Sequence, residues 1–393
     1  GLQMAPFRFV DSKGTLRINS LNLPDRFGIP HLKLDRAHLE GKGKEITAHV
    51  LRLLLKDRPI DLSGSLNITP DANILDLKLR AGELDYEWLK AVQDMAQKEG
   101  SADGTVDLSR IQGTADIKID AFRLGNLNIA PVQGAMDISR DKITLMISEM
   151  GLCQLDPLGR IAFGESSISA ELSANVKAQE LARTSSCLGG GEDLISGKYA
   201  LNLRTGGEGE TFSELKSNNK GKLRFQAREG RIYRITVLAK VLALLNASEI
   251  LFGEGPDLQE DGLGYNSIDI EGKIKGQVLH LKEAVVDGKS LKLAATGEIN
   301  FATQRLNLIV LVSPLKTVDR IVSWIPIVNY IMDNTLVTIP FQVFGKMKDP
   351  TVVPMSPQAV GSEVFGIMKR TLSLPFKVLQ PFGSDSDNEK DGE

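Results

Sequence analysis

Hydrophobic and polar residues alternate along most of the chain, in short runs separated by Gly, Asp or Asn. Between Arg305 and Leu315, for example, Leu306, Leu308, Val310 and Val312 alternate with Asn307, Ile309, Leu311 and Ser313. Successive side chains of a strand point to opposite faces, so this pattern predicts a sheet with an apolar face. Similar runs recur at intervals of about a dozen residues, and hairpins connect such strands most simply. We predict a mainly-β chain with a long antiparallel sheet and few helices.

Five segments instead repeat their apolar residues with a helical period. In one of them Ile235, Leu238 and Val241 share a helix face. We expect helices of this kind to plug or cap the sheet. The predicted helices are Leu84–Lys98, Gln179–Thr184, Ile232–Ala247, Val318–Met332 and Pro357–Ser373.

The apolar face of the predicted sheet needs a cover, which is a second sheet, a layer of helices or a ligand that is not protein. We expect Val318–Met332 to cover the face that carries Ile309 and Leu311. The opposite face is then the candidate groove lining, because polar residues do not interrupt it. The predicted lining residues are Leu291, Leu293, Leu306, Leu308, Val310 and Val312.

Composition argues against several functions. The chain of 393 residues has a formal net charge of -3, so it lacks the basic field of a nucleic-acid-binding protein. Aromatic residues make up only 5%, which suits aliphatic packing better than stacked bases or sugars. The four histidines are scattered, and we find no nucleophile elbow, HExxH or Cys-x-x-Cys motif. We therefore predict no catalytic site, no cofactor and no metal.

Two cysteines, Cys153 and Cys187, leave two alternatives open. They either form a disulfide or remain as two buried thiols. No run of 18 or more uncharged apolar residues occurs, so we predict no transmembrane helix within this sequence.

The last predicted helix is amphipathic, and the end of the sequence is acidic. Val360, Val364, Ile367 and Met368 share one helix face, with Lys369 and Arg370 nearby. Such a helix either caps the final strand or also contacts a membrane surface or a partner. The terminal residues 384–393 are all polar or Gly and predict a disordered acidic tail.

The sequence from Tyr233 to Pro381 is similar to the C-terminal region of the AsmA-like family. The shared features are Gly230–Tyr233, the turn Asp287-Gly288, the strand "TGEINF", Ser313-Pro314-Leu315, Ile325-Pro326, Ile339-Pro340, and Gly345 with Asp349 and Pro350. Asn329 departs from the family, which usually has Gly after the proline at Pro326. Residues 1–150 share only the strand repetition.

The resemblance implies a periplasmic protein of Gram-negative bacteria that an upstream helix tethers to the inner membrane. Its fold would be a curved, taco-like β-groove, with residues 1–150 as a repetitive segment and 151–383 as the AsmA-like region with capping helices. The implied function is bridge-like transfer of phospholipid between the inner and outer membranes, with membrane surfaces at the groove ends and possible membrane-protein partners. A periplasmic location also favours the Cys153–Cys187 disulfide. The alternatives are a scaffold for outer-membrane protein assembly and a carbohydrate-binding or adhesin-like β-solenoid.

Overall fold

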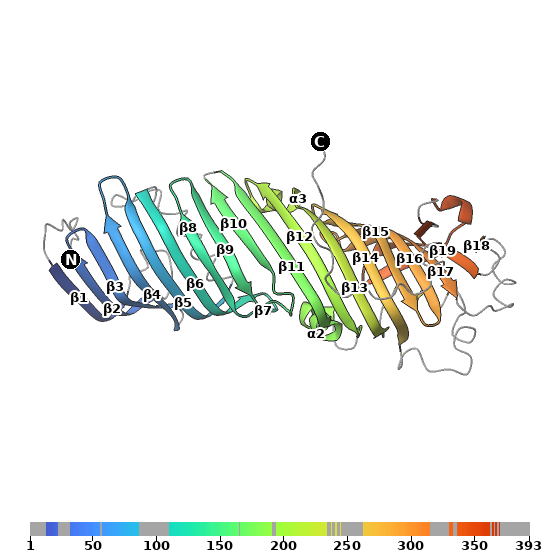
Figure 1. The fold of residues 1–393 in the computed structure, drawn as a ribbon, viewed down its shortest axis with the longest axis horizontal. Coiled ribbons are helices and arrows are strands. Elements are labelled where there is room, and N and C mark those ends of the chain that lie inside the picture. The colour runs from blue at the N-terminus through green and yellow to red at the C-terminus, as the bar shows by residue number, and fades with distance from the viewer. Residues whose placement is uncertain are drawn as a thin grey trace. The chain divides into compact units, whose positions relative to one another are not determined.

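Strands dominate this computed structural model, in agreement with the predicted class (Figure 1). The chain divides into two compact units, an N-terminal one that ends mainly at Leu152 and a C-terminal one that holds most residues from Leu172 onward. The structure describes residues 13–22, 32–55, 57–85, 110–164, 166–190, 194–233, 262–314, 330–332 and 336–361, with 237, 240, 241, 244, 364, 366, 367 and 369.

The N-terminal unit is an open, single sheet. Its strands are β1 (Lys13–Asn22), β2 (Leu32–Lys42), β3 (Glu45–Leu55), β4 (Arg58–Ile68), β5 (Asn73–Asp85), β6 (Ile111–Leu124), β7 (Leu127–Ile129), β8 (Val132–Ile138), β9 (Lys142–Met150) and β10 (Leu158–Gly164). Neighbours from β1 to β5 pair antiparallel, and so do β6 with β8, β8 with β9 and β9 with β10. The short β7 pairs with the end of β6.

One step of this sheet is parallel, and the sequence did not predict it. β5 and β6 run in the same direction, with Leu77 opposite Ala115 and Leu79 opposite Ile117. Consecutive parallel strands need a crossover connection rather than a hairpin turn. The antiparallel direction predicted from the alternation is therefore wrong at this one pairing among those described.

The C-terminal unit carries a second run of antiparallel strands. They are most of β11 (Ile168–Glu180), then β12 (Lys198–Gly209), β13 (Lys220–Ile232), β14 (Leu263–Lys275), β15 (Val278–Gly288), β16 (Leu291–Asn300), β17 (Arg305–Pro314), β18 (Tyr330–Met332), β19 (Leu336–Lys346) and β20 (Asp349–Pro354). Neighbours pair from β12 to β17, after which β17 pairs with β19 and β19 with β20. β18 forms a small hairpin with the start of β19.

The described helices are few, as the sequence predicts, but they are shorter than most of the predicted ones and their positions differ in part. α2 (Leu181–Ser185) agrees with the predicted Gln179–Thr184, whereas α3 (Phe212–Ser217) was not predicted. Leu84 belongs to β5, and Tyr330–Met332 form β18, so neither of those two predicted helices has the expected bounds. Residues 237, 240, 241 and 244 are helical, as are 364, 366, 367 and 369. Residues 86–98, 318–329 and the tail at 384–393 lie outside the described part of the chain.

Small residues lie on the apolar face of the N-terminal sheet at positions where strands approach closely. Gly64 has a φ of 145°, and a Cβ there would lie 2.0 Å from the carbonyl oxygen of Asp76. Gly113, with a φ of 143°, would bring a Cβ within 1.8 Å of the Leu75 oxygen. Only glycine adopts this backbone without strain, so these two positions cannot carry a side chain.

Candidate functional site: the apolar face of the N-terminal sheet

Strand register places apolar side chains in continuous rows across the N-terminal sheet. One row holds a single residue from each of nine strands, and every member is apolar or Gly. At a strand spacing of about 4.8 Å, such a row is roughly 40 Å long. The row consists of Leu16, Leu39, Ala48, Gly64, Leu77, Ala115, Met136, Leu145 and Ile161.

Two further rows flank the first and extend the same face, which we call the apolar face. The first flanking row contains Ile18, Ala37, Leu51, Leu62, Leu79, Ile117, Gly134, Ile147 and Gly159. The second contains Gly41, Ile46, Leu66, Leu75, Gly113, Ile138, Ile143 and Phe163. The face is thus almost free of polar side chains over the whole width of the unit.

The other face of the same strands is polar. Arg52 forms a two-pronged ion pair with Asp61, at 2.6 and 3.0 Å, which raises the pKa of the arginine. On β2, a hydrogen bond with His49 and then the nearby Lys13 hold the pKa of Glu40 below its ordinary value. These exposed contacts are those of a solvated sheet surface. Each of these strands therefore has one apolar face and one polar face.

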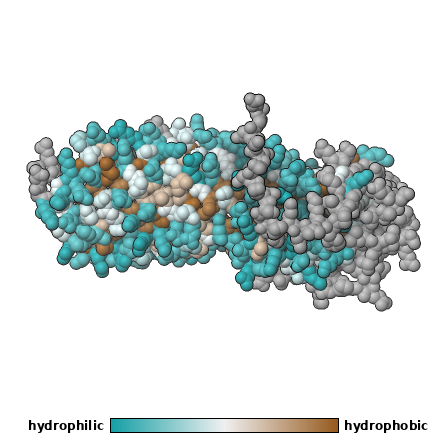
Figure 2. Space-filling view, in the orientation of Figure 1, coloured by the Kyte–Doolittle hydropathy of each residue, from teal (hydrophilic) through white to brown (hydrophobic). Residues whose placement is uncertain are grey.

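The apolar face is only partly covered. Leu75, Leu77 and Leu79 are half-buried, while Leu16 is 53% exposed, Ile143 39% and Phe163 38%. Among the described residues of this unit, Ile60, Ala81 and Leu84 form a buried cluster near one end of the strands, and Ala37, Ala115 and Ile147 are buried individually within the rows. No helix lies over this face within the described residues of the unit. Figure 2 shows the result as a hydrophobic band along the N-terminal strands, bordered by hydrophilic residues.

A large exposed apolar surface is unusual in a soluble protein and marks a site for a partner, a membrane or a ligand. The sequence did contain the signal for this surface. The stretch "ILDLKLR" at residues 74–80 alternates as strictly as the stretch around Leu308. What the pattern could not predict was which of the two stretches stays open.

The six predicted lining residues do lie together, but in the C-terminal unit. Leu293 pairs with Val312 on the face of β16 and β17 that also carries Leu291, Leu306, Leu308 and Val310. Leu291 and Val312 are fully buried, and Leu306 and Leu308 are only 9% exposed. Their role in contacting lipid remains a prediction.

The cover over this C-terminal face includes the chain itself. Val241, 1% exposed, and Val237 belong to the same hydrophobic cluster as the predicted lining residues. The helical residues 237, 240, 241 and 244, which we call the covering segment, thus plug this part of the sheet, as amphipathic helices were expected to do. Among the described residues, the predicted lining residues are therefore buried in a cluster that includes the covering segment.

The second face of β15–β17 is covered from the C-terminal side. Val360, Val364 and Ile367 are 5–7% exposed and cluster with Ala294 and Leu311. Among the described residues, Leu311 therefore packs against the C-terminal segment, while the expected cover, Val318–Met332, is described only at β18. These three residues are thus buried in the structure, and their contact with a membrane or a partner stays a prediction. Lys369 is exposed, whereas Met368 and Arg370 lie outside the described residues.

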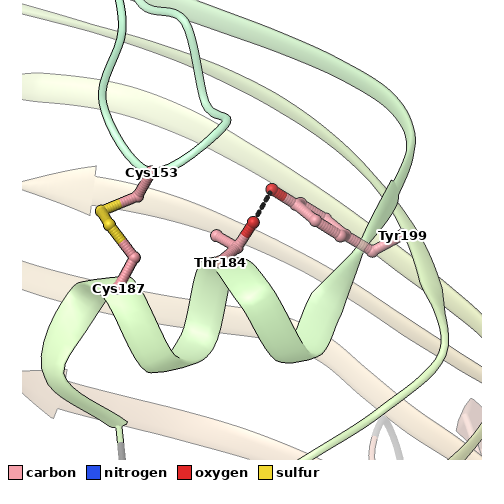
Figure 3. The surroundings of a disulfide bond; sticks show 4 residues. All are labelled: Cys153, Thr184, Cys187 and Tyr199. Carbon is pink, nitrogen blue, oxygen red and sulfur yellow. Dashed lines mark hydrogen bonds between the residues drawn. A yellow bond between two sulfur atoms is a disulfide. The ribbon is translucent and has the colours of Figure 1, made fainter. Parts of the chain in front are cut away.

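Cys153 and Cys187 are joined by a disulfide with an S–S distance of 2.02 Å (Figure 3). The bond links a loop before β10 to the helical turn that follows α2. Next to it, the hydroxyl groups of Thr184 and Tyr199 share a buried hydrogen bond of 2.9 Å. These two contacts hold α2 against the sheet, so their role is structural.

Two features are missing from the described part of the chain, a metal-binding group and a membrane-spanning helix. No group of His, Cys, Asp or Glu is arranged to hold a metal ion there. None of the described helices has the length and hydropathy needed to cross a bilayer.

Comparison with known proteins places the chain in a family. The model of the YhdP protein family matches residues 25–352, which is most of the sequence. The chain belongs to the YhdP family. This family is related to the AsmA-like bridge-type lipid-transfer proteins, so the AsmA-like resemblance is right for the wider group and not for AsmA itself. Searches of curated proteins and of solved structures find no match.

Proposed function

We propose that this YhdP-family chain is a lipid-transfer protein whose apolar face conducts phospholipid between the inner and outer membranes. The single observation that supports this most is the uninterrupted apolar face across β1–β10, which the described protein leaves open. The family relationship makes lipid the natural occupant. The protein would then lie in the periplasm, tethered to the inner membrane, and would carry out no catalytic step.

The energetics of lipid transfer explain why such a face is useful. Each methylene that enters water costs roughly 0.8 kcal/mol, so a lipid with two long acyl chains faces a barrier on the order of 20 kcal/mol. Rows of similar apolar sites, one strand apart, replace that barrier with a series of small steps. No specific polar recognition is needed along the rows, because each strand offers much the same surface.

Photo-crosslinking tests this proposal directly. A crosslinking residue at Leu77, on the apolar face, should capture lipid in living cells. The neighbouring position Lys78 points to the polar face and is the matched control, where no lipid should be captured. Equal lipid capture at the two positions, or capture at neither, would contradict the proposal.

A second candidate, a scaffold for outer-membrane protein assembly, is favoured by the sheet edges. β1 pairs only with β2 among the described residues, contains no proline and exposes Leu16 and Leu21. By contrast, Pro350 and Pro354 interrupt the edge strand β20. Proline blocks strand addition, so β1 is the edge that could accept an extended segment. The test places crosslinking residues along the edge of β1 that faces away from β2. Capture of unfolded outer-membrane protein at this edge, with no lipid captured at Leu77, would favour the scaffold.

A further inference from the structure

One end of the N-terminal strands carries a row of exposed cations, which we call the basic rim. Register places the ends in one line, from Lys13 opposite Lys42, through Asn73 opposite Ile111, to Lys142 opposite Gly164. The cations of this rim are Lys13, Lys42, Lys44, Arg110, Arg140 and Lys142. Its described carboxylates are fewer, namely Glu40, Glu45, Asp71 and Asp141.

Much of this positive charge is not neutralised. Lys42, Lys44 and Lys142 are exposed and form no ion pair with any described residue. Arg110 and Arg140 donate hydrogen bonds to the backbone oxygens of Pro70 and Asp71, respectively, at the turn between β4 and β5. Carbonyl oxygens satisfy the donors of a guanidinium but do not cancel its charge. Among the rim cations, only Lys13 pairs with a described carboxylate, that of Glu40, at 3.3 Å.

The opposite end of the same strands has a different charge balance. Arg58 is paired with Asp85 at 3.3 Å, and Arg123 with Glu83, so both arginines are compensated. The third cation described there is Lys33. The acidic residues described at this end are Asp57, Glu83, Asp85, Glu149 and Asp156. The two ends of the apolar face are thus electrostatically distinct.

Exposed apolar side chains lie directly beside the basic rim. Ile143, at the rim end of β9, is 39% exposed on the apolar face. Lys142 before it, like Lys13 and Lys42, alternates to the polar side, but it does so at the very end of its strand. Ile68, 38% exposed, donates its backbone N–H to the Lys44 oxygen at 2.8 Å. The tight cluster of Ile60, Ala81 and Leu84 lies toward the other end of the strands. The apolar face therefore opens at the strand ends that carry the cations. A long lysine side chain at a strand end can extend past the edge of the sheet, which suits an anionic amphiphile whose chains lie on the apolar face.

We propose that the basic rim binds the phosphate head groups of lipids whose acyl chains lie on the apolar face. A strand rises about 3.3 Å per residue, so Leu77 lies roughly 13 Å from the rim residue Asn73. That distance is close to one leaflet of a bilayer, about 15 Å of hydrocarbon. A head group at the rim thus lets its chains reach the central rows. This inference rests on the proposed function and adds a single orientation for the lipid.

The test compares two lipids with identical acyl chains, anionic phosphatidylglycerol and uncharged diacylglycerol, offered to the 393-residue chain. The variant Lys42→Glu/Lys44→Glu/Lys142→Glu reverses the charge at three positions of the rim. Arg17→Glu/Lys78→Glu/Lys118→Glu makes the same charge change on the polar face in the middle of the strands, away from the rim, and is the matched control. Circular dichroism and thermal unfolding verify the fold, and the Lys→Gln rim triple is a milder second variant. Bound lipid is quantified by mass spectrometry at low and high salt.

We expect the rim reversal to weaken capture of phosphatidylglycerol about tenfold, with capture of diacylglycerol and the polar-face control unchanged. High salt should reduce the preference of the natural chain for the anionic lipid. Equal effects of the rim variant on both lipids, or no effect on either, would overturn the inference. Failure of the natural chain to bind either lipid would instead contradict the proposed function itself.

Two further measurements distinguish a lipid carried on the apolar face from two other sources of phosphate, a free phosphate ester and a membrane surface. Glycerol phosphate, which has the head group without chains, should bind far more weakly than phosphatidylglycerol. Comparable binding of the two, both lost in the rim variant, would make the rim a general anion site and overturn the orientation. Loss of sedimentation with phosphatidylglycerol vesicles, without any change in the lipid that is carried, would make the rim a membrane-docking surface and also overturn it.

Discussion

Lys240 Nζ donates a 2.5 Å hydrogen bond to Asp349 Oδ1, joining residues 109 positions apart in the sequence. The same ammonium group donates to the backbone oxygen of Pro350 at 2.7 Å. These bonds fix the covering segment beside β19 and β20, with Val241 turned into the core. The Asp349 side chain is 80% exposed, so the contact stabilises the fold little and mainly positions the segment.

Removal of this contact should loosen the covering segment. We expect Lys240→Met and Asp349→Asn to increase several-fold the rate at which a cysteine at Val241 reacts with a thiol reagent. Lys222→Met removes an exposed lysine of β13 and serves as the control. A labelling rate that is the same in all three backgrounds would show that apolar packing alone holds the segment.

The same contact predicts a pH dependence. The hydrogen bond from Lys240, together with its charge, lowers the pKa of Asp349 from its ordinary value. A lowered pKa means that the stabilisation is present above the pKa of the unfolded carboxyl group and is lost as the pH falls through the folded value. Hydrogen exchange around Val241, corrected for intrinsic rates, should therefore accelerate below about pH 4. Asp349→Asn should remove this acid-dependent step.

Leu77 and Leu308 provide a matched comparison between an open and a closed apolar face. At Leu308, 9% exposed, an aspartate would be buried without a partner, and we expect a loss of several kcal/mol in the free energy of unfolding. At the half-buried Leu77, water reaches the new carboxylate, so folding should survive while lipid capture fails. Thermal unfolding and lipid crosslinking measure the two effects. Equal destabilisation by the two variants would mean that the N-terminal face is covered in solution.

These two leucines also show how far the sequence could predict the site. Alternation places each leucine on the apolar face of its strand, and the strand register agrees with that placement in both units. Burial depends instead on packing between segments distant in sequence, such as Val241 and the β17 residues that share its hydrophobic cluster, and periodicity carries no information about such packing. For the same reason the alternation around Leu77 gave no sign that β5 and β6 are parallel, because strand direction does not change the period.

The disulfide should contribute to the stability of the C-terminal unit. Cys153 and Cys187 are 34 positions apart, and closing a loop of this length contributes about 3–4 kcal/mol on the chain-entropy model. We expect Cys153→Ser/Cys187→Ser to lower the midpoint of thermal unfolding. Reducing agent should lower the midpoint of the natural chain to a similar value and leave the double variant unchanged. Free thiols in the denatured, unreduced protein would contradict the pairing.

Tyr265 carries a buried hydroxyl that links its strand, β14, to the segment before β12. Its hydroxyl donates a 2.5 Å hydrogen bond to the Ser196 oxygen, and its side chain is fully buried. Burial raises the pKa of Tyr265 to about 12. Because the pKa is raised, the neutral Tyr265 hydroxyl stabilises the folded state fully below the pKa of an unfolded tyrosine, near 10. This stabilisation is lost as the pH rises through the pKa of the folded state.

Tyr265→Phe should therefore lower the free energy of unfolding at neutral pH by about 1–3 kcal/mol, because the Ser196 oxygen loses its donor. The difference between the natural chain and this variant should shrink as the pH rises from about 10 to 12, since only the natural chain has a hydroxyl to ionise at this position. Tyr233→Phe, at a half-buried tyrosine, is the control for the loss of a phenol. Denaturant unfolding at a series of pH values measures the effect, and a difference that stays constant with pH would show that the Tyr265 hydroxyl does not titrate in the folded state.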